Sequence, residues 1–444
     1  MVPLTASDVE AIGLEAARAA WAGGMTVLRP DGAVAEIPLV AEPEVFPAAQ
    51  LAALAEEARV LCSGAVKLAR ALLVRGDERD RAALLGPFQG LEAEAMARLF
   101  DEAPCPAVVV RVDFLRDGDG AARALELNAT IPAMSGYADL ATHCWIRAAA
   151  RVRGMTPRQA NALVSGCGSR MEQLRQALAA FHAARGGTRA RPSIALVARP
   201  GDAQVGELRR IAEHFRQMGH EAENLVPEDC EPERWDVLYR HVWAHRTPPG
   251  SPFARALRAP GRFVLANPVN GMLEAKALFA RLSECAEDGE LARLAGLDEA
   301  ERAAARRLPC TRRLDAAVAA RVLAERPRWV LKRSWDYGGK SVHLGTELDD
   351  AAWRATVEAA LADERGGGFV AQERVVAARR PATRVTPAGV ERAELYRDVS
   401  TYAGLGPSVP SGSVVRAAAS PIVNILGGGG LAPVVPQEVL EALA

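Results

Sequence analysis

Residues 106–129 read PAVVVRVDFLRDGDGAARALELNA, and the rest of the chain can be interpreted outward from this segment. Residues 106–115 are rich in Val and predict a buried strand, DGDG is typical of a turn, and residues 121–129 predict a returning strand. Alternate side chains share one face of a strand, so Glu126 and Asn128 point the same way. Their oxygen atoms suit Mg²⁺ that carries nucleotide phosphates, although a solvent-facing polar edge would show the same pattern.

A second segment with phosphate-binding character follows about two hundred residues later. WVLKRSWDYGGKSVHLG (329–345) predicts a strand, a glycine turn and a second strand. Lys332 ends the first strand, and Gly338 and Gly339 allow backbone N–H groups to approach phosphate oxygens closely. Asp336 is placed to turn toward the same metal as Glu126. The segment is not a P-loop, because its lysine precedes the glycines, and an ordinary hairpin is the alternative.

The C-terminal third contains two further candidate elements. Gln372 and Glu373 end the predicted strand GFVA, at a point where free main-chain groups commonly bind an adenine edge, although a plain sheet strand has the same pattern. Arg416 lies on a later strand and is suited to hold a carboxylate or an acyl phosphate through two hydrogen bonds. Asn424 and the glycines at 427–430 follow, and they predict either a closing loop over phosphates or a flexible terminal loop.

Composition limits the classes of function. The chain has 444 residues and a net charge of −1, so no long-range field attracts nucleic acid or an anionic membrane. Its first residues resemble no signal peptide, and no apolar run is long enough to span a membrane. The seven cysteines form no CxxC pair and predict reduced thiols. These features together predict a cytoplasmic protein without nucleic-acid or membrane partners, and the composition is ordinary for a soluble globular enzyme.

Residues 193–243 predict a strand, a helix and a second strand of a small open sheet, after a break at ARGGTRARP (184–192). Such a unit also occurs in dinucleotide-dependent oxidoreductases, but the loop after its first strand lacks GxGxxG, which ranks that function low. Ala- and Leu-rich helical segments at 47–75 and 157–186 are better suited to a core or to a homodimer contact than to partner motifs.

The order of these segments resembles eukaryotic glutathione synthetase and glutathionylspermidine synthase-like ligases, the circularly permuted branch of the ATP-grasp family. The resembling blocks are RVDFL with ALELNATIPAMSGYADL (111–140), LYRHVW (238–243), FVLANPVNGMLEAKALFARL (263–282), WVLKRSWDYGGKSVHLG, FVAQERV, and SVVRAAASPIVNILGGGGLAPV. In ordinary ATP-grasp proteins the Glu-x-Asn pair comes last, whereas here it precedes the lysine segments.

The resemblance implies an α/β (α+β) ATP-grasp fold with antiparallel sheets and a small open α/β substrate domain. It divides the chain into an N-terminal part of the core (1–190), the substrate domain (191–265), and nucleotide-binding and lid subdomains (266–444). It also implies an ATP- and Mg²⁺-dependent ligase that joins a small-molecule carboxylate to an amine.

The resemblance assigns these roles to particular residues. Glu126, Asn128 and Asp336 would hold Mg²⁺, while Arg111 and Arg416 would bind the reacting carboxylate. Nucleotide contacts are implied for Lys276, Lys332, Gly338, Gly339, Lys340, Gln372, Glu373, Gly428 and Gly429, and substrate contacts for Ser135, Tyr137, Arg240 and Asn424.

The family pattern is not matched at every position. Asp336 stands where the family has Glu, Trp243 where it has Tyr, and NATIPAMSG where it has the serine segment that reads the peptide substrate. The resemblance therefore does not name the acid or the amine. An ATP-binding regulatory protein of the same fold, without catalysis, is the alternative function.

Overall fold

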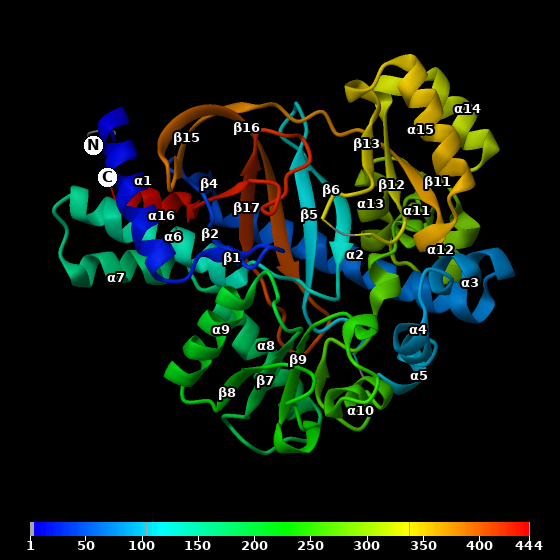
Figure 1. Ribbon diagram of the computed structural model, residues 1–444, viewed down its shortest axis with the longest axis horizontal. Coiled ribbons are helices and arrows are strands. Elements are labelled where there is room, and N and C mark those ends of the chain that lie inside the picture. The colour runs from blue at the N-terminus through cyan, green and yellow to red at the C-terminus, as the bar shows by residue number, and fades with distance from the viewer. Residues whose placement is uncertain (1–3, 104, 337, 444) are drawn as a thin grey trace.

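The computed structural model describes residues 4–103, 105–336 and 338–443, and three multistranded sheets organise it (Figure 1). The central sheet has seven strands in the order β15 (Arg380–Thr386), β3 (Leu39–Val40), β18 (Gly430–Ala432), β17 (Ser413–Ala418), β16 (Gly389–Ala403), β5 (Val110–Arg116) and β6 (Ala122–Asn128). The strands predicted over 106–115 and 121–129 are therefore confirmed as its β5–β6 hairpin. All pairings are antiparallel except that of β18 with β3.

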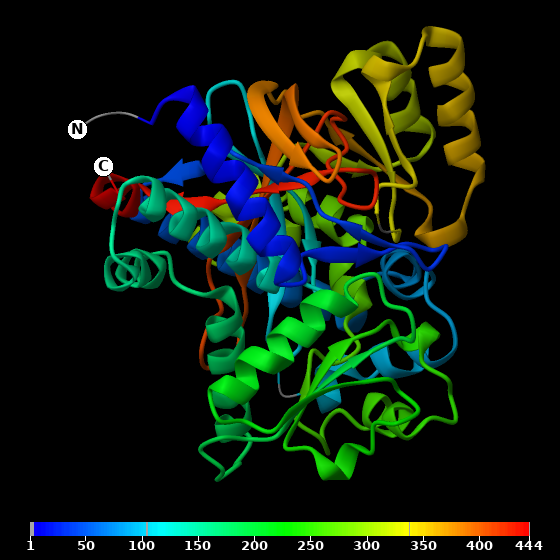
Figure 2. The same ribbon diagram turned by 60° about the vertical axis from the view of Figure 1, so that its left-hand side comes forward.

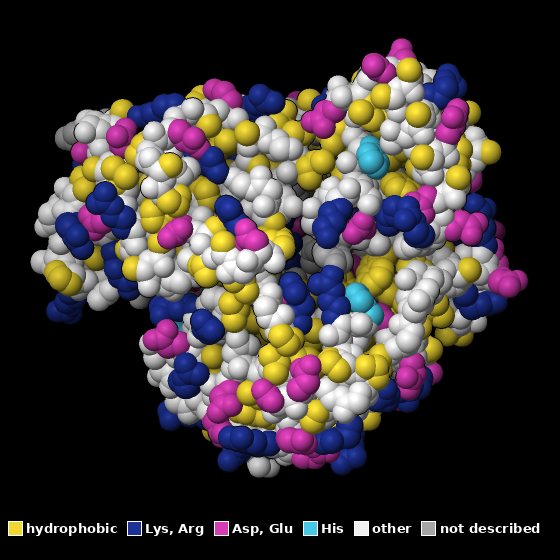
Figure 3. Space-filling model, in the orientation of Figure 1, with side chains coloured by type: hydrophobic (Ala, Val, Ile, Leu, Met, Phe, Trp, Pro, Cys, Tyr) yellow, Lys and Arg dark blue, Asp and Glu magenta, His cyan; other side chains and the backbone are white. Residues whose placement is uncertain are grey.

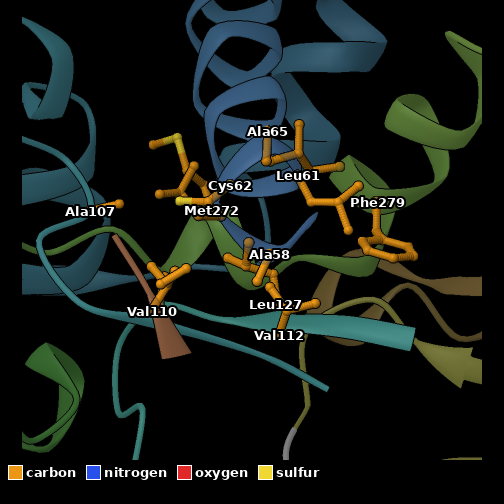
Figure 4. Packing of buried hydrophobic residues seen from close by; sticks show 14 of the residues in the cluster. Ala58, Leu61, Cys62, Ala65, Ala107, Val110, Val112, Leu127, Met272 and Phe279 are labelled. Atoms are coloured by element: carbon orange, nitrogen blue, oxygen red, sulfur yellow. The ribbon is translucent and has the colours of Figure 1, made fainter. Parts of the chain in front are cut away.

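The apolar face of the central sheet packs on a long helix, α2 (Ala48–Arg75). Figure 4 shows Val110, Val112 and Leu127 of the sheet beside Ala58 and Leu61 of the helix. This arrangement follows from strand alternation: apolar side chains alternate along β5 with Arg111 and Asp113, which lie on the other face. Burial of the apolar face thus turns the charged residues toward the opposite side of the sheet.

A second, antiparallel sheet consists of β11 (Thr311–Arg313), β14 (Phe369–Glu373), β12 (Trp329–Arg333) and β13 (Val342–Leu344), in that order. It confirms the predicted strand–turn–strand over 329–345 and the strand that ends near Glu373. Helices α14 (Ala316–Ala324) and α15 (Asp350–Ala362) cover it with a separate small core. Helices α11 (Lys276–Glu284), α12 (Gly289–Ala295) and α13 (Glu299–Arg307) pack on α2, and α11 also contacts β11 and β14 of this sheet.

The third sheet is parallel and has the order β10 (Leu265–Ala266), β9 (Val237–His241), β7 (Ile194–Ala198) and β8 (Ala222–Leu225). The predicted first strand, helix and second strand are confirmed as β7, α9 (Val205–Gln217) and β9, but α9 connects β7 to β8, a strand that was not predicted. Helices α8 (Arg170–Ala184) and α10 (Pro252–Arg258) pack nearby, and the unit lies below the central sheet in both views (Figure 2). From β7 the chain moves outward to β8, and from β9 it moves outward in the opposite direction to β10, which makes the gap between β7 and β9 a topological switch point.

The remaining elements complete the periphery. Strands β1 (Thr26–Leu28) and β2 (Val34–Glu36) form an antiparallel hairpin, and β4 (Glu44–Phe46) pairs with β19 (Val434–Pro436). The other helices are α1 (Ala6–Ala22), α3 (Glu78–Leu85), α4 (Gly90–Met96), α5 (Leu99–Glu102), α6 (Ser135–Val152), α7 (Pro157–Gly166) and α16 (Gln437–Leu443).

The helical region predicted over 157–186 is interrupted between α7 and α8, where Ser169 caps the second helix. Its side chain accepts a hydrogen bond from the N–H of Glu172. All seven cysteines are free thiols, as predicted. Among the described residues no helix has both the length and the apolar character needed to cross a bilayer.

Candidate functional site

A cavity of about 610 Å³ lies where the three sheets meet. The charged face of the central sheet forms one wall, the β12–β14 sheet forms the second, and the carboxyl ends of the parallel strands form the third. Figure 3 shows Lys and Arg side chains on both sides of the central hollow of this face. The cavity is lined by twelve of the residues that the sequence singles out: Arg111, Glu126, Asn128, Lys276, Lys332, Asp336, Gly338, Gly339, Lys340, Gln372, Glu373 and Arg416, together with Asn424 from a loop.

Two arginines and two aspartates form a buried network on the central sheet. Register places Asp113 opposite Glu126 and Asp398 opposite Arg416. Arg111 donates Nε and Nη2 to the carboxylate of Asp113 at 2.7 and 3.0 Å, and Arg416 donates to Asp113 at 2.8 Å and to Asp398. Burial raises the pKa of Asp113, but Arg111 and Arg416 outweigh it, so this pKa lies well below its ordinary value.

The network fixes Arg416 as a guanidinium. Burial lowers the pKa of Arg416, but the negative charges of Asp398 and Asp113 raise it by a larger amount, so the net shift is upward. Arg111 has the same direction of shift, because Asp113 outweighs its burial. Both arginines therefore stay protonated and are held in a fixed orientation at the cavity wall, paired with Asp113 and Asp398. Sequence reasoning gave Asp113 and Asp398 no role, although Asp113 alternates with Arg111 on a strand.

The three predicted metal-binding side chains face the same cavity. Glu126 lies 3.4 Å from the ammonium of Lys276, and Asp336 accepts a 2.5 Å hydrogen bond from Ser341. Burial raises the pKa of Glu126, but Lys276, Lys332 and Arg416 offset it and keep the carboxylate ionised.

These oxygen donors fit Mg²⁺. The side-chain nitrogen of Asn128 is buried and makes no hydrogen bond within the described chain, as is expected of a side chain that completes its contacts with a bound group. Within the same residues no three His, Cys, Asp or Glu side chains cluster as a metal cage. Mg²⁺ needs no such cage, because it is commonly held by one or two carboxylates, waters and phosphate oxygens.

Two lysines lie next to these groups. Lys276 begins α11 and donates to the main-chain oxygen of Asp336 at 3.2 Å, which joins that helix to the glycine turn. Lys332 is buried and donates to Oε1 of Gln372 at 2.6 Å. Burial lowers the pKa of Lys332 to about 8, with Glu126 opposing the shift. Gly338 and Gly339 both have φ of +72°, a conformation that favours glycine and exposes backbone N–H groups.

The strand end that was predicted to flank adenine is at the cavity wall. β14 ends at Glu373, and residues 374–379 continue without regular structure. The side chain of Gln372 is used within the protein, because it also donates to the main-chain oxygen of Leu125 at 3.2 Å. Leu125 is the bulged residue between the pairs Asp113–Glu126 and Phe114–Ala124.

The loop between β17 and β18, residues 419–429, covers one end of the cavity. Asn424 donates its side-chain amide to the main-chain oxygen of Gly338 at 2.8 Å. Ile422 packs so closely on Gly339 that an added Cβ there would lie 2.6 Å from it. Gly428 and Gly429, which were predicted to bind nucleotide, instead lie at the return of the loop and outside the cavity lining. Their N–H groups donate to Ile425 and Asn424.

The structure does not bring three predicted substrate residues to the cavity. Arg240 is buried and donates to the main-chain oxygens of Asn267, Val242 and Pro268, at 2.7–2.9 Å. Tyr137 is buried and donates to the main-chain oxygen of Thr26. Ser135 lies 3.4 Å from Glu207, at the start of α6. These side chains join segments of the fold, and their acceptors come from parts of the chain that local sequence patterns do not connect.

Sequence reasoning assigned the parallel unit to the substrate, but of the residues that form this third wall it named only Trp243. Arg199, Asp202 and Gln204 follow β7, and Trp243 and Arg246 follow β9; all five line the cavity. Trp243 contacts Trp335 of the glycine turn edge to face, with ring centroids 5.4 Å apart. The position of these residues at a switch point was available as a signal, since ligands bind at such points in open α/β sheets.

Glu274 was missed as well. It also lines the cavity, and its Oε1 accepts the N–H of Ala129 at 2.6 Å. Its distance in sequence from the Glu-x-Asn strand gave no local signal.

A glutathione synthetase-like effector from Globodera pallida, solved in its apo form, has a similar structure. The two share 12% sequence identity with a TM-score of 0.58, and the match covers 97% of this chain and 98% of the effector. No protein-family model matches the sequence, and no curated protein matches it. The full coverage confirms the predicted fold, with its mixed α/β architecture and several sheets. The circular permutation stays a prediction. The chain therefore has a glutathione synthetase-like fold.

Proposed function

We propose that this protein is an ATP-dependent carboxylate–amine ligase of the ATP-grasp type. The observation that supports the proposal is one cavity that contains Glu126, Asn128 and Asp336 together with two lysines and the Arg111–Arg416 network. Phosphoryl transfer requires positioning and charge neutralisation more than covalent catalysis by the protein. The cavity offers both, because positive groups and oxygen ligands face each other across it.

In the proposed reaction a substrate carboxylate attacks the γ-phosphate of ATP, which gives an acyl phosphate and ADP. An amine then attacks the acyl carbon, and phosphate leaves as the amide forms. Lys276 and Lys332 would hold the phosphate oxygens. Arg111 and Arg416 would orient the carboxylate and stabilise the charge of the tetrahedral step. Mg²⁺ held by Glu126, Asn128 and Asp336 would neutralise phosphate charge.

The loop that carries Asn424 would exclude water while the acyl phosphate exists. Its contact with Gly338 joins the loop to the turn that faces the phosphates. Water must be excluded because hydrolysis of the acyl phosphate would consume ATP without forming an amide.

The first test removes the metal-binding carboxylates. We expect Glu126→Ala and Asp336→Ala to fold normally and to lose ADP release by about a thousandfold, which is roughly 4 kcal/mol of transition-state stabilisation. ADP release is measured with ATP, Mg²⁺ and mixtures of carboxylic acids and amino acids, and folding by thermal unfolding. Asp119→Ala is the control, because Asp119 is exposed in the turn of the same hairpin.

Full activity in either variant would refute the metal assignment. ATP binding without ADP release on any mixture would instead identify a nucleotide-binding protein that is not a ligase. Transfer of ¹⁸O from a labelled carboxylate to phosphate would demonstrate the acyl phosphate directly.

A further inference from the structure

Three arginines surround one buried carboxylate behind the central sheet. Oε1 of Glu44, on β4, accepts hydrogen bonds from Nη2 of Arg380 at 2.8 Å and from Nη1 of Arg397. Arg116 lies over the ring of Phe46, with its Cζ 4.2 Å from the ring centroid. Glu44 and Phe46 alternate on β4 and share one of its faces, which places Arg116 beside the same carboxylate. We call the three arginines and Glu44 the rear cluster.

The rear cluster is separate from the site described above. Arg116 shares a face of β5 with Val112 and Phe114, which belong to the core that includes α2. Arg397 alternates with Asp398 on β16 and therefore lies on the opposite face of the sheet from the arginine–aspartate network. None of the four residues of the rear cluster lines the cavity.

The rear cluster has more positive than negative charge. Glu44 is the only carboxylate within ion-pair distance of Arg380 and Arg397 among the residues that the structure describes. Burial lowers the pKa of Arg116, Glu44 opposes the shift, and the positive charges of Arg380 and Arg397 lower it further. Three guanidiniums and one carboxylate repel one another on balance, and a bound anion would relieve that repulsion.

The rear cluster also has hydrogen-bond donors without an acceptor. Nη2 of Arg116 and Nε of Arg397 are buried and make no hydrogen bond within the described parts of the chain. Buried donors in proteins are normally satisfied, so these atoms are consistent with a bound group that supplies the acceptors. The side chain of Arg380 is 44% exposed, and Arg379 and Pro381 beside it are exposed as well. A small ion in solution can therefore reach the cluster.

We infer that the rear cluster binds a small oxyanion of the phosphate type, either inorganic phosphate or a phosphate monoester. Its oxygens would accept from Nη2 of Arg116, from Nε of Arg397 and from the exposed guanidinium of Arg380. Guanidinium groups match such oxyanions through several directed N–H donors, which a chloride ion cannot use in the same way. An ion held there would connect β5, β15 and β16 and would stabilise the folded protein. The inference does not depend on the proposed ligase function.

The first test measures binding. Inorganic phosphate and methyl phosphate are titrated calorimetrically into the full chain, without ATP, at an ionic strength held constant with chloride. We expect Arg116→Gln and Arg380→Gln each to weaken one phosphate site by about tenfold, as loss of one charge-assisted hydrogen bond implies. Phosphate that binds in the cavity would be unaffected by either substitution, so the difference from the unaltered protein isolates the rear cluster.

Arg392→Gln is the matched control, because it removes an exposed arginine of β16 that pairs with Glu10. Tighter binding of methyl phosphate than of inorganic phosphate would identify a monoester as the ligand, and the reverse would identify the free ion. The inference is overturned if no phosphate binds, or if Arg380→Gln binds it as the unaltered protein does. Arg380 is exposed, so this variant is expected to fold even if Arg116→Gln does not.

A second test removes the one negative charge of the rear cluster. We expect Glu44→Gln to unfold at a lower temperature than the unaltered protein in chloride, because the three guanidiniums then lack any counter-charge. Millimolar phosphate, too dilute for general salt effects, should raise the unfolding temperature of Glu44→Gln more than that of Arg392→Gln. An equal effect of phosphate on both variants would show that the cluster is an ion-pair network without a ligand and would overturn the inference.

Discussion

Burial of Lys332 limits the pH range over which its side chain is positively charged. Its ammonium is positive below a pKa of about 8, which is lowered by burial, and neutral above it. Because only the charged form attracts phosphate, we expect ATP affinity to fall by up to tenfold per pH unit above about pH 8. Calorimetric titration of ATP from pH 7 to 9.5 measures this dependence.

Lys332→Met provides the control for this dependence. The variant should bind ATP more weakly at pH 7 and should show no inflection near pH 8, because it has no ammonium to titrate. An inflection that persists in Lys332→Met would mean that another group is responsible.

At the residue scale, sequence predicts a side chain when its partners are close in sequence or follow a strand period. Glu126 and Asn128 could be paired because they alternate on one strand, and the structure places both at the cavity. Arg240 could not be distinguished from a ligand-binding arginine. Its acceptors at Asn267 and Pro268 belong to a different loop, whose approach depends on the whole parallel sheet.

At the element scale, the loop over residues 419–429 is held by few contacts. Asn424 donates to Gly338, and Ile422 packs on Gly339. We expect Asn424→Ala to loosen the loop, so that proteolysis within 419–429 becomes several-fold faster and ADP release exceeds amide formation. The physical reason is that an open loop admits water to the acyl phosphate. The measurement compares ADP with amide product under the same conditions.

Ser408→Ala is a suitable control, since that residue lies in the connection before β17 and does not line the cavity. Unchanged proteolysis together with equal amounts of ADP and amide in Asn424→Ala would contradict the assigned role of the loop.

Helices and strands with a clear hydrophobic period could be predicted from the sequence. Which of their residues face the cavity was harder to predict. The hairpin of β5 and β6 and the βαβ unit follow from local patterns. The glycines at 427–430 indicate a loop, but their composition does not say which part of the loop faces the cavity. The register between β17 and β18 determines which part of the loop faces the cavity. Arg416 pairs with Leu431, and this pairing fixes where the loop turns back.

At the scale of the whole molecule, Glu207 joins the parallel unit to the helical layer. It lies on α9, is buried, and accepts the N–H groups of Met134 and Gly136 at 3.0 Å at the start of α6. Burial raises its pKa from about 4.5 to about 7, and the N–H donors oppose the shift. The folded protein therefore binds a proton between these values that the unfolded chain has released.

The sign of the resulting pH dependence follows from linkage. A group with a raised pKa in the folded state contributes stability below its unfolded value and loses it as pH rises through the folded value. We expect the free energy of unfolding to fall between about pH 4.5 and 7, and Glu207→Gln to flatten this slope. Denaturant unfolding at several pH values measures it.

Glu274 adds to the same slope, because burial also raises its pKa to about 7. The Glu207→Gln variant is therefore expected to flatten the slope in part, and a slope identical to that of the unaltered protein would contradict the assignment. Glu213→Gln, an exposed carboxylate of the same helix, serves as the control.

The general architecture was accessible from the order of segments, since six blocks in one order constrain a fold more than any single motif. The arginines of the third wall were not accessible, because Arg199 and Arg246 have no local motif and come to the same sheet edge only when β7 and β9 pair.

The edge-to-face contact of Trp243 with Trp335 provides the molecule with an intrinsic optical reporter. One indole follows a strand of the parallel sheet and the other belongs to the glycine turn of the second sheet. Because indole fluorescence responds to nearby charge and to neighbouring rings, relative motion of the two walls should change the emission without an added dye. Stopped-flow recording of that emission would then follow each arrival and departure at the cavity in real time.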